Sequence, residues 1–287
     1  MGLFRKAKQA IADLVQRHPY TYFYSKILVN RLPYFLPHEQ SFFAFRHLAR
    51  DNDGLFLDVG ANDGISALSF RKINQHYSIV SIEANPYHAT SLQRLTRKLQ
   101  GFSYHLIGAS NEFTEFDLYV PFYKSLPFHS ASTLHADFHQ ENFKQLFSSS
   151  VLSHFRWERT RIKTAPLDSL RLKPSIIKID VEGHEMQVLQ GLQTTIATCR
   201  PYLMVECSHD SFSEVDRFLR AHDLIAASYS ANEDAFRIIG EDFVFDMGAV
   251  EQRNIFYIPQ EQVPLVPVAN TRLRKDYNSP PTRFKNL

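Results

Sequence analysis

The sequence predicts an α/β protein whose mostly parallel, seven-stranded sheet carries helices on both faces. Short apolar segments alternate with amphipathic segments from residue 55 onward, which is typical of strands joined by crossover helices. The first apolar segment runs into a glycine-containing turn and then directly into a helix, as in Rossmann-like sheets. With 287 residues, 44% of them hydrophobic, the chain is long enough for one large domain of this kind.

Each element is predicted from its apolar period and its flanking residues. The buried strands are expected at Leu55–Val59, Ile79–Ile82, Ser103–Leu106, Ile176–Ile179 and Tyr202–Val205. The helices are expected at Ile65–Ile73, Ser91–Leu99, Glu185–Leu192 and Glu214–Ala221. An antiparallel edge of the same sheet is expected from Ile225–Tyr229, Phe236–Ile239 and Asn254–Ile258.

Residues 51–260 form the predicted domain, and segments of different composition flank or interrupt it. Residues 1–50 are expected to form a helical and aromatic extension that includes an amphipathic helix over residues 3–15. Residues 121–163 show no clear period, and we expect a lid-like insertion there. Residues 261–287 are expected to form a basic, proline-containing tail.

Charge and composition narrow the function classes. The net charge of +2 balances 32 basic against 30 acidic residues, so we expect no nucleic-acid partner. The two cysteines, Cys199 and Cys207, are too few for a disulfide framework or a cysteine-built zinc site. No apolar segment approaches the ~18 residues of a membrane span. We therefore expect a cytoplasmic protein, while the helix over residues 3–15 can lie on a membrane surface, on the domain or on a second copy of the chain.

The turn after the first strand is where a nucleotide-like ligand is expected, because ligands of open α/β sheets bind at the carboxyl ends of strands. Its sequence is Asp58-Val59-Gly60-Ala61-Asn62-Asp63-Gly64. Gly60 lets the backbone pass close to a ligand, and Gly64 lets the following helix start against the strand. Its G-x-x-x-G spacing lacks the second and third glycines of the dinucleotide fingerprint, which argues against an NAD-dependent enzyme.

Two further strand ends fit a cofactor without a phosphate, such as S-adenosylmethionine. Glu83 ends the second strand, where an acidic side chain can accept both hydroxyls of a ribose. After the third strand, Ala109 and Ser110 place small and polar groups where an adenine ring is expected.

The segment Lys178-Ile179-Asp180-Val181-Glu182-Gly183-His184-Glu185 resembles the K-I-D-V-E-G-x-E motif of the FkbM family of S-adenosylmethionine-dependent methyltransferases. Four further motifs of the family resemble segments of this chain in the same order: Asp58–Gly64, Ile82–Pro86, Ile107–Asn111 and Thr164–Leu170. The resemblance covers about residues 52–260, with Asn111 and His184 departing from the residues most frequent in the family.

The resemblance implies a class I methyltransferase fold with S-adenosylmethionine as the cofactor. It further implies methyl transfer to oxygen, often to a sugar hydroxyl of a glycan, glycolipid or natural product, so a saccharide or glycolipid acceptor is the expected partner. The residues expected to bind the cofactor are Asp58, Gly60, Asn62, Gly64, Glu83, Ala109, Ser110 and Asp180.

A hydroxyl of an unactivated sugar has a high pKa, so its methylation benefits from a base. Asp180 and Glu182 lie at the end of the fourth strand, although they could instead cap a helix and orient the loop. His184 follows them, and an imidazole pKa of about 6.5 suits proton transfer near neutrality. His135 lies in the aromatic, histidine-rich insertion. We expect the catalytic residues among these four.

No metal site is expected, because His135 and His139 share a helical face without a confirmed third ligand. Two alternatives stay open. One is a metal-dependent O-methyltransferase that acts on a non-sugar hydroxyl through Asp180 and Glu206, by analogy with catechol O-methyltransferases. The other is a non-catalytic scaffold that binds the cofactor. The sequence is also compatible with a homo-oligomer, whichever function applies.

Overall fold

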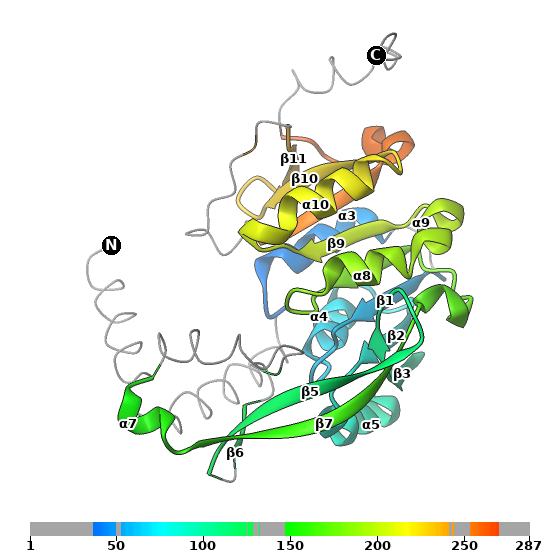
Figure 1. Ribbon diagram of the computed structural model, residues 1–287. Helices are drawn as coiled ribbons and strands as arrows, with labels where there is room; N and C mark the ends of the chain where they lie inside the picture. The colour runs from blue at the N-terminus through cyan, green and yellow to red at the C-terminus, as the bar shows by residue number, and fades with distance from the viewer. Residues whose placement is uncertain are drawn as a thin grey trace.

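The computed structural model describes residues 37–49, 53–124, 126–128, 132, 147–240, 243 and 253–269. Two sheets form its framework (Figure 1). The larger sheet has eight strands in the order β11-β10-β12-β9-β8-β1-β2-β3, and the smaller has the order β4-β7-β5-β6. The amphipathic helix predicted over residues 3–15 and the tail beyond residue 269 lie outside the described residues.

Five central strands of the large sheet run parallel, as predicted. They are β1 (Leu55–Val59), β2 (Ser78–Glu83), β3 (Phe102–Leu106), β8 (Ile176–Ile179) and β9 (Tyr202–Glu206). Three strands form the antiparallel edge: β10 (Leu224–Ser230), β11 (Ala235–Ile238) and β12 (Asn254–Pro259). The sheet therefore contains all eight strands expected individually from the sequence, one more than the seven named for the fold class, and β11 is its outermost strand, paired with β10.

Helices cover both faces of this sheet, which confirms the predicted fold class. On one face lie α8 (Glu185–Gln190), α9 (Gln193–Cys199) and α10 (His209–Arg220). On the other lie α4 (Ile65–Ile73) and α5 (Ala89–Lys98), the latter preceded by the 3-10 turn η3 (Pro86–His88). The inner strands β1, β2, β8 and β9 are buried on both faces, which explains why their sequences are largely apolar, whereas the edge strand β3 is mostly exposed. No helix in the described part of the chain is long and apolar enough to cross a membrane.

A short N-terminal segment completes the α4 face of the sheet. It consists of η2 (Gln40–Ala44) and α3 (Phe45–Leu48). The ring of Phe45 is fully buried and lies 5.5 Å, between centroids, from the rings of both Phe56 and Phe70. Residues that the sequence places in the extension before residue 51 thus pack into the core, because their aromatic side chains have an apolar face of β1 and α4 to cover.

A long antiparallel hairpin extends beyond the body of the domain, with α7 (Ser149–Leu152) near its far end (Figure 1). Its strands, β5 (Thr114–Tyr123) and β7 (Phe155–Ala165), pair in register from Thr114 opposite Thr164 to Tyr123 opposite Phe155. The short strands β4 (Gly108–Ala109) and β6 (Leu126–Pro127) pair at its two sides.

Residues 121–163, which show no clear period in the sequence, begin within strand β5 and end within strand β7. Charged residues line the exposed side of the hairpin, where Arg159 and Arg161 both pair with Asp117. Such cross-strand pairs stabilise a two-stranded ribbon without the continuous apolar run that marks a buried strand. Most of residues 129–146, including His135, lie outside the described part of the chain, and the lid role stays a prediction.

Candidate functional site

A cleft lies at the carboxyl ends of β1, β2 and β8, with the β5/β7 hairpin forming one wall. It encloses about 1050 Å³ of space, part of which is open to solvent. Five of the residues predicted to bind a cofactor line this cleft: Gly60, Asn62, Glu83, Ala109 and Asp180. Three of the four predicted catalytic residues line it as well: Asp180, Glu182 and His184. The structure thus brings together residues that are up to 124 positions apart (from Gly60 to His184) in the chain.

Three predicted residues lie behind this lining. Asp58 is fully buried and accepts a 3.0 Å hydrogen bond from the Ser81 hydroxyl. Gly64 is the N-cap of α4 in the left-handed conformation, with φ 89°. Ser110 is buried, and its hydroxyl lies 3.2 Å from Nε2 of His184. These residues shape the site from behind, and His135 lies outside the described residues.

The loop between β1 and α4 depends on Gly60. Its φ of 82° is in the left-handed region, which favours glycine. A Cβ atom at this position would lie 1.7 Å from the carbonyl oxygen of Asp180. The loops after β1 and β8 can therefore touch only if residue 60 has no side chain.

Glu83 presents a prepared pair of acceptor oxygens to the cleft. Its Oε1 accepts the backbone N–H of Asn85 and its Oε2 that of Asn62, each over 2.7 Å. A carboxylate oxygen has two lone pairs, so each oxygen keeps one for a ligand. Burial raises the pKa of Glu83 to about 7, although the two N–H groups act in the opposite direction. The geometry suits two adjacent hydroxyl groups.

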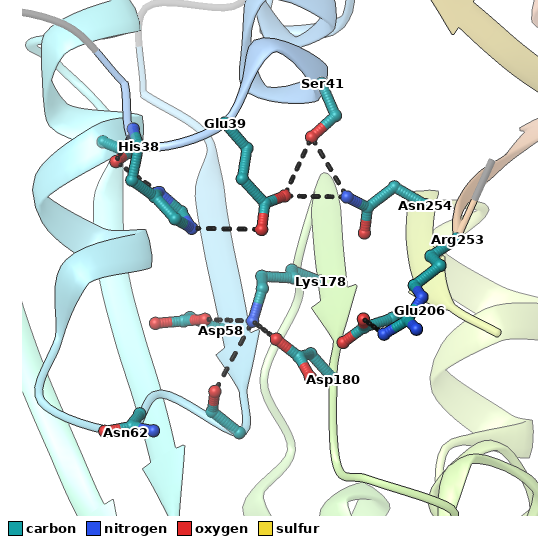
Figure 2. Close-up of polar contacts among 12 residues, drawn as sticks. His38, Glu39, Ser41, Asp58, Asn62, Lys178, Asp180, Glu206, Arg253 and Asn254 are labelled. Carbon is teal, nitrogen blue, oxygen red and sulfur yellow. Dashed lines mark hydrogen bonds and ion pairs between the residues drawn. The ribbon is translucent and has the colours of Figure 1, made fainter. Parts of the chain in front are cut away.

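Lys178 is a buried cation in the middle of the site (Figure 2). Its Nζ lies 3.0 Å from Oδ2 of Asp180, 3.6 Å from Oδ1 of Asp58 and 3.5 Å from the carbonyl oxygen of Gly60. Burial alone would lower the pKa of Lys178, but the charges of Asp180 and Asp58 outweigh burial and raise it. Lys178 is not among the residues predicted from the sequence to bind the cofactor or to catalyse the reaction. The signal was a lysine inside the apolar strand Ile176–Ile179, two positions before Asp180.

Asp180 and Glu206 form a hydrogen-bonded carboxyl pair beside the lysine. Burial and the contact with Asp180 raise the pKa of Glu206. Burial acts to raise the pKa of Asp180 too, but Lys178 and the hydrogen bond from Glu206 outweigh it and lower the pKa. Glu206 therefore carries the proton and donates a hydrogen bond to the ionised Asp180. The guanidinium of Arg253, 3.8 Å from Glu206, is 48% exposed, so solvent screens its charge.

His184 lies on the other side of the cleft from this pair. Its ring contacts Ser110 and packs edge-on against Phe116 of β5, with 5.9 Å between ring centroids. Glu182, which precedes it, is exposed and has φ 52°. The catalytic roles predicted for these two residues stay predictions.

The carboxylates offer little to a metal ion. Within the described ranges, no group of three or more His, Cys, Asp or Glu side chains is arranged to hold one. A divalent cation on Asp180 would also lie next to the ammonium of Lys178, a like charge.

The order of strands, the loop at Gly60 and the acid at the end of β2 together are typical of methyltransferases. Residues 58–225, more than half of the chain, match the model of the methyltransferase FkbM domain. This chain belongs to the FkbM methyltransferase family. The resemblance read from the motif around Asp180 is thereby confirmed, whereas no curated protein sequence matches the chain.

Three solved structures are weakly similar to this chain. The FkbM methyltransferase from Methylobacillus flagellatus KT matches with a TM-score of 0.45 and 15% identity over 72% of this chain and 43% of that one. The precorrin-6Y C5,15-methyltransferase from Geobacter metallireducens GS-15 matches with a TM-score of 0.37 and 11% identity over 75% and 83%. Fibrillarin from Methanococcus jannaschii matches with a TM-score of 0.39 and 11% identity over 72% and 66%. The chain thus spans less than half the length of the first of these.

Proposed function

We propose that this FkbM methyltransferase transfers a methyl group from S-adenosylmethionine to an oxygen atom, namely a sugar hydroxyl of a glycan, glycolipid or natural product. One observation carries the proposal. The buried Glu83 keeps one lone pair on each carboxylate oxygen in a cleft that the ionised Asp180 also lines. The carboxylate of Glu83 suits the two hydroxyls of a ribose. The carboxylate of Asp180 suits an acceptor hydroxyl that gives up its proton.

The cleft residues fit this methyl donor part by part. Glu83 would accept the two ribose hydroxyls. The apolar side, which includes Ile107, Leu118 and Ile162, would cover the flat adenine ring. The polar side, with Asn62 and Asp180, would receive the charged amino acid portion. When bound, S-adenosylmethionine supplies a methyl group that is already activated by the positive sulfur.

The remaining task for the protein is to align an acceptor oxygen and to receive its proton. Asp180 suits the second role, because it lines the cleft and carries a charge. The choice of a sugar acceptor follows the family resemblance.

Calorimetry tests the donor first. We expect micromolar binding of S-adenosylmethionine to the wild type, much weaker binding to Glu83→Ala and no binding of NAD. Binding of NAD in place of S-adenosylmethionine would contradict the proposal.

The acceptor is tested with tritium-labelled S-adenosylmethionine and a panel of methyl hexosides and methyl deoxyhexosides, with and without EDTA. We expect labelled product that resists EDTA. A donor that binds but transfers no label to any acceptor class, including lipid-linked saccharides, would indicate a scaffold. Loss of label with EDTA would indicate a metal-dependent reaction.

A further inference from the structure

We infer that Lys178 and Glu206 are positioning residues that make Asp180 the proton acceptor of the methyl transfer, with Lys178 fixing its charge and Glu206 directing its carboxylate. The inference rests on the proposed function, because it assigns the proton of the acceptor hydroxyl. Neither residue belongs to the set predicted to be catalytic from the sequence.

The position of Lys178 in β8 brings it to Asp180. Residues two apart in a strand point to the same side, so Lys178 and Asp180 share one side of the strand end. Asp58 approaches the same ammonium from β1, which pairs with β8 with Asp58 opposite Lys178. One buried cation thus holds a carboxylate behind the cleft and a carboxylate in its wall.

The Asp180–Glu206 pair can hold only one negative charge at low cost, because two adjacent carboxylates repel each other. Lys178 selects which of the two is ionised, since its Nζ lies 3.0 Å from Asp180 and makes no such ion pair with Glu206. Glu206, whose side chain is 31% exposed, keeps the proton and donates a hydrogen bond to Asp180.

This arrangement leaves Asp180 with acceptor capacity toward the cleft. An ionised carboxylate has about four lone-pair sites. Lys178 takes one of them on Oδ2, and Glu206 takes another. The remaining sites belong to a side chain that lines the cleft, where an acceptor hydroxyl can reach them.

The proposed step balances in charge. The acceptor oxygen forms a bond to the methyl carbon while the carbon–sulfur bond breaks, and the electron pair of that bond stays on sulfur. The hydroxyl proton passes to Asp180. The positive charge on sulfur and the negative charge on Asp180 therefore disappear together, and the low-dielectric site gains no net charge.

Other charged and titratable groups surround Asp180 and set its environment. They are Lys178 from β8 itself, Asp58 from the neighbouring β1, Glu182 from the following loop, Glu206 and Arg253 from the β9 and β12 side, and His38 and Glu39 from the N-terminal segment. His38 is neutral near pH 7, because burial lowers its pKa to about 4.

Infrared difference spectroscopy tests the location of the proton without an acceptor. In the difference spectrum between the wild type and Glu206→Gln at pH 7, we expect a protonated-carboxyl band from Glu206, because any contribution from Glu83 is common to both proteins and cancels. The exposed Asp210→Asn serves as the matched control and should give no such difference band. Absence of the band from the Glu206→Gln difference spectrum would overturn the inference.

Kinetics test the positioning roles, with a methyl hexoside that the labelled-donor assay identifies as the acceptor. Glu206→Ala should lower kcat about tenfold through loss of a charge-assisted hydrogen bond, and Glu206→Gln should recover most of it, because an amide donates the same bond. Lys178→Met should lower kcat about 100-fold, with partial rescue by Lys178→Arg.

The pH profile separates positioning from a merely structural role. The acidic limb of kcat should move to higher pH by about one unit in Glu206→Ala and further in Lys178→Met, because each change removes a group that favours ionised Asp180. The inference would be overturned if the acidic limb of the kcat profile stayed at its wild-type pH in variants that still bind S-adenosylmethionine. Loss of donor binding in the wild type would instead refute the proposed function.

Discussion

The backbone N–H of Asn62 donates a 2.7 Å hydrogen bond to Oε2 of Glu83, which ties the loop after β1 to the end of β2. The backbone N–H of Asn85 donates a hydrogen bond of the same length to Oε1 of Glu83. The two bonds hold the carboxylate plane in place before any ligand arrives. Because the group is also buried, its charge is costly until hydroxyl donors bind it.

Donor binding should therefore depend on pH. The ionised Glu83 accepts two hydroxyls, whereas a protonated one loses acceptor capacity, so affinity should fall as the pH drops through about 7. One proton taken up on release of the ligand gives a limiting slope of about tenfold in Kd per pH unit. Calorimetry of S-adenosylmethionine between about pH 5.5 and 8.5 measures this slope. Glu83→Gln should bind weakly at every pH, and a flat wild-type profile would contradict the expectation.

Two glycines with positive φ provide a matched pair of variants. Gly60 has φ 82° and Gly183 has φ 97°. A Cβ at Gly183 meets nothing within 4 Å, so Gly183→Ala should cost only backbone strain, about 1–2 kcal/mol. A Cβ at Gly60 would lie 1.7 Å from the carbonyl oxygen of Asp180, so Gly60→Ala should cost more than about 4 kcal/mol and abolish donor binding. Urea unfolding measures the loss of unfolding free energy in both variants. Similar losses would show that the loops after β1 and β8 can move apart.

His38 should make the protein sensitive to acid. Its Nδ1 lies 2.7 Å from the Ser69 hydroxyl, and burial lowers its pKa from 6.5 to about 4. The folded state then binds fewer protons than the unfolded state between these values, so the free energy of unfolding should fall as the pH drops from 6.5 toward 4. The full loss from this group is about 3 kcal/mol.

Urea unfolding between pH 6.5 and 4 measures the size and the sign of this change in the free energy of unfolding. His38→Gln should remove that part of the pH dependence. His209→Gln, at a side chain that is 69% exposed, is the control and should leave the dependence unchanged. An unaltered pH dependence in His38→Gln would show that another group titrates.

Asp168 should stabilise the fold without a role in the reaction. Its carboxylate accepts the backbone N–H groups of Thr194 and Thr195, both over 2.8 Å, and the Thr195 hydroxyl over 2.6 Å, at the start of α9. Burial would raise the pKa of Asp168, but these hydrogen bonds outweigh it and lower the pKa, so its stabilisation is present at neutral pH and lost as the pH falls through the folded-state pKa.

Asp168→Ala should therefore lower the free energy of unfolding by about 1–2 kcal/mol at neutral pH, with no change in Kd for the donor. Asp210 lies in the first turn of α10 and its side chain is fully exposed. Asp210→Ala should therefore lower the free energy of unfolding by only a small fraction of the loss in Asp168→Ala. An equal effect of the two variants would refute a specific capping role.

The central strands and their loops are predictable from the sequence because their signals are local. Strand β1 is an apolar run with a turn that contains Gly60 and Gly64, and α4 follows with its apolar period intact. The hairpin of β5 and β7 is not predictable in this way. Its pairing joins residues such as Thr114 and Thr164 across a long intervening segment, and its exposed side is held by charges instead of apolar contacts.

The candidate site divides along the same line. Glu83 could be placed from the sequence, since strand ends of a parallel sheet meet at one edge. The location of the proton shared by Asp180 and Glu206 could not be predicted from the sequence. Ionisation of a carboxyl depends on burial and on groups that other strands bring close, here Asp58 from β1 and Glu206 from β9, and the chain order records neither. Local patterns therefore account for the strands, the glycine turn and the acid at the end of β2. The electrostatics of the cleft arise only when the sheet assembles, because they depend on distances between residues far apart in the chain.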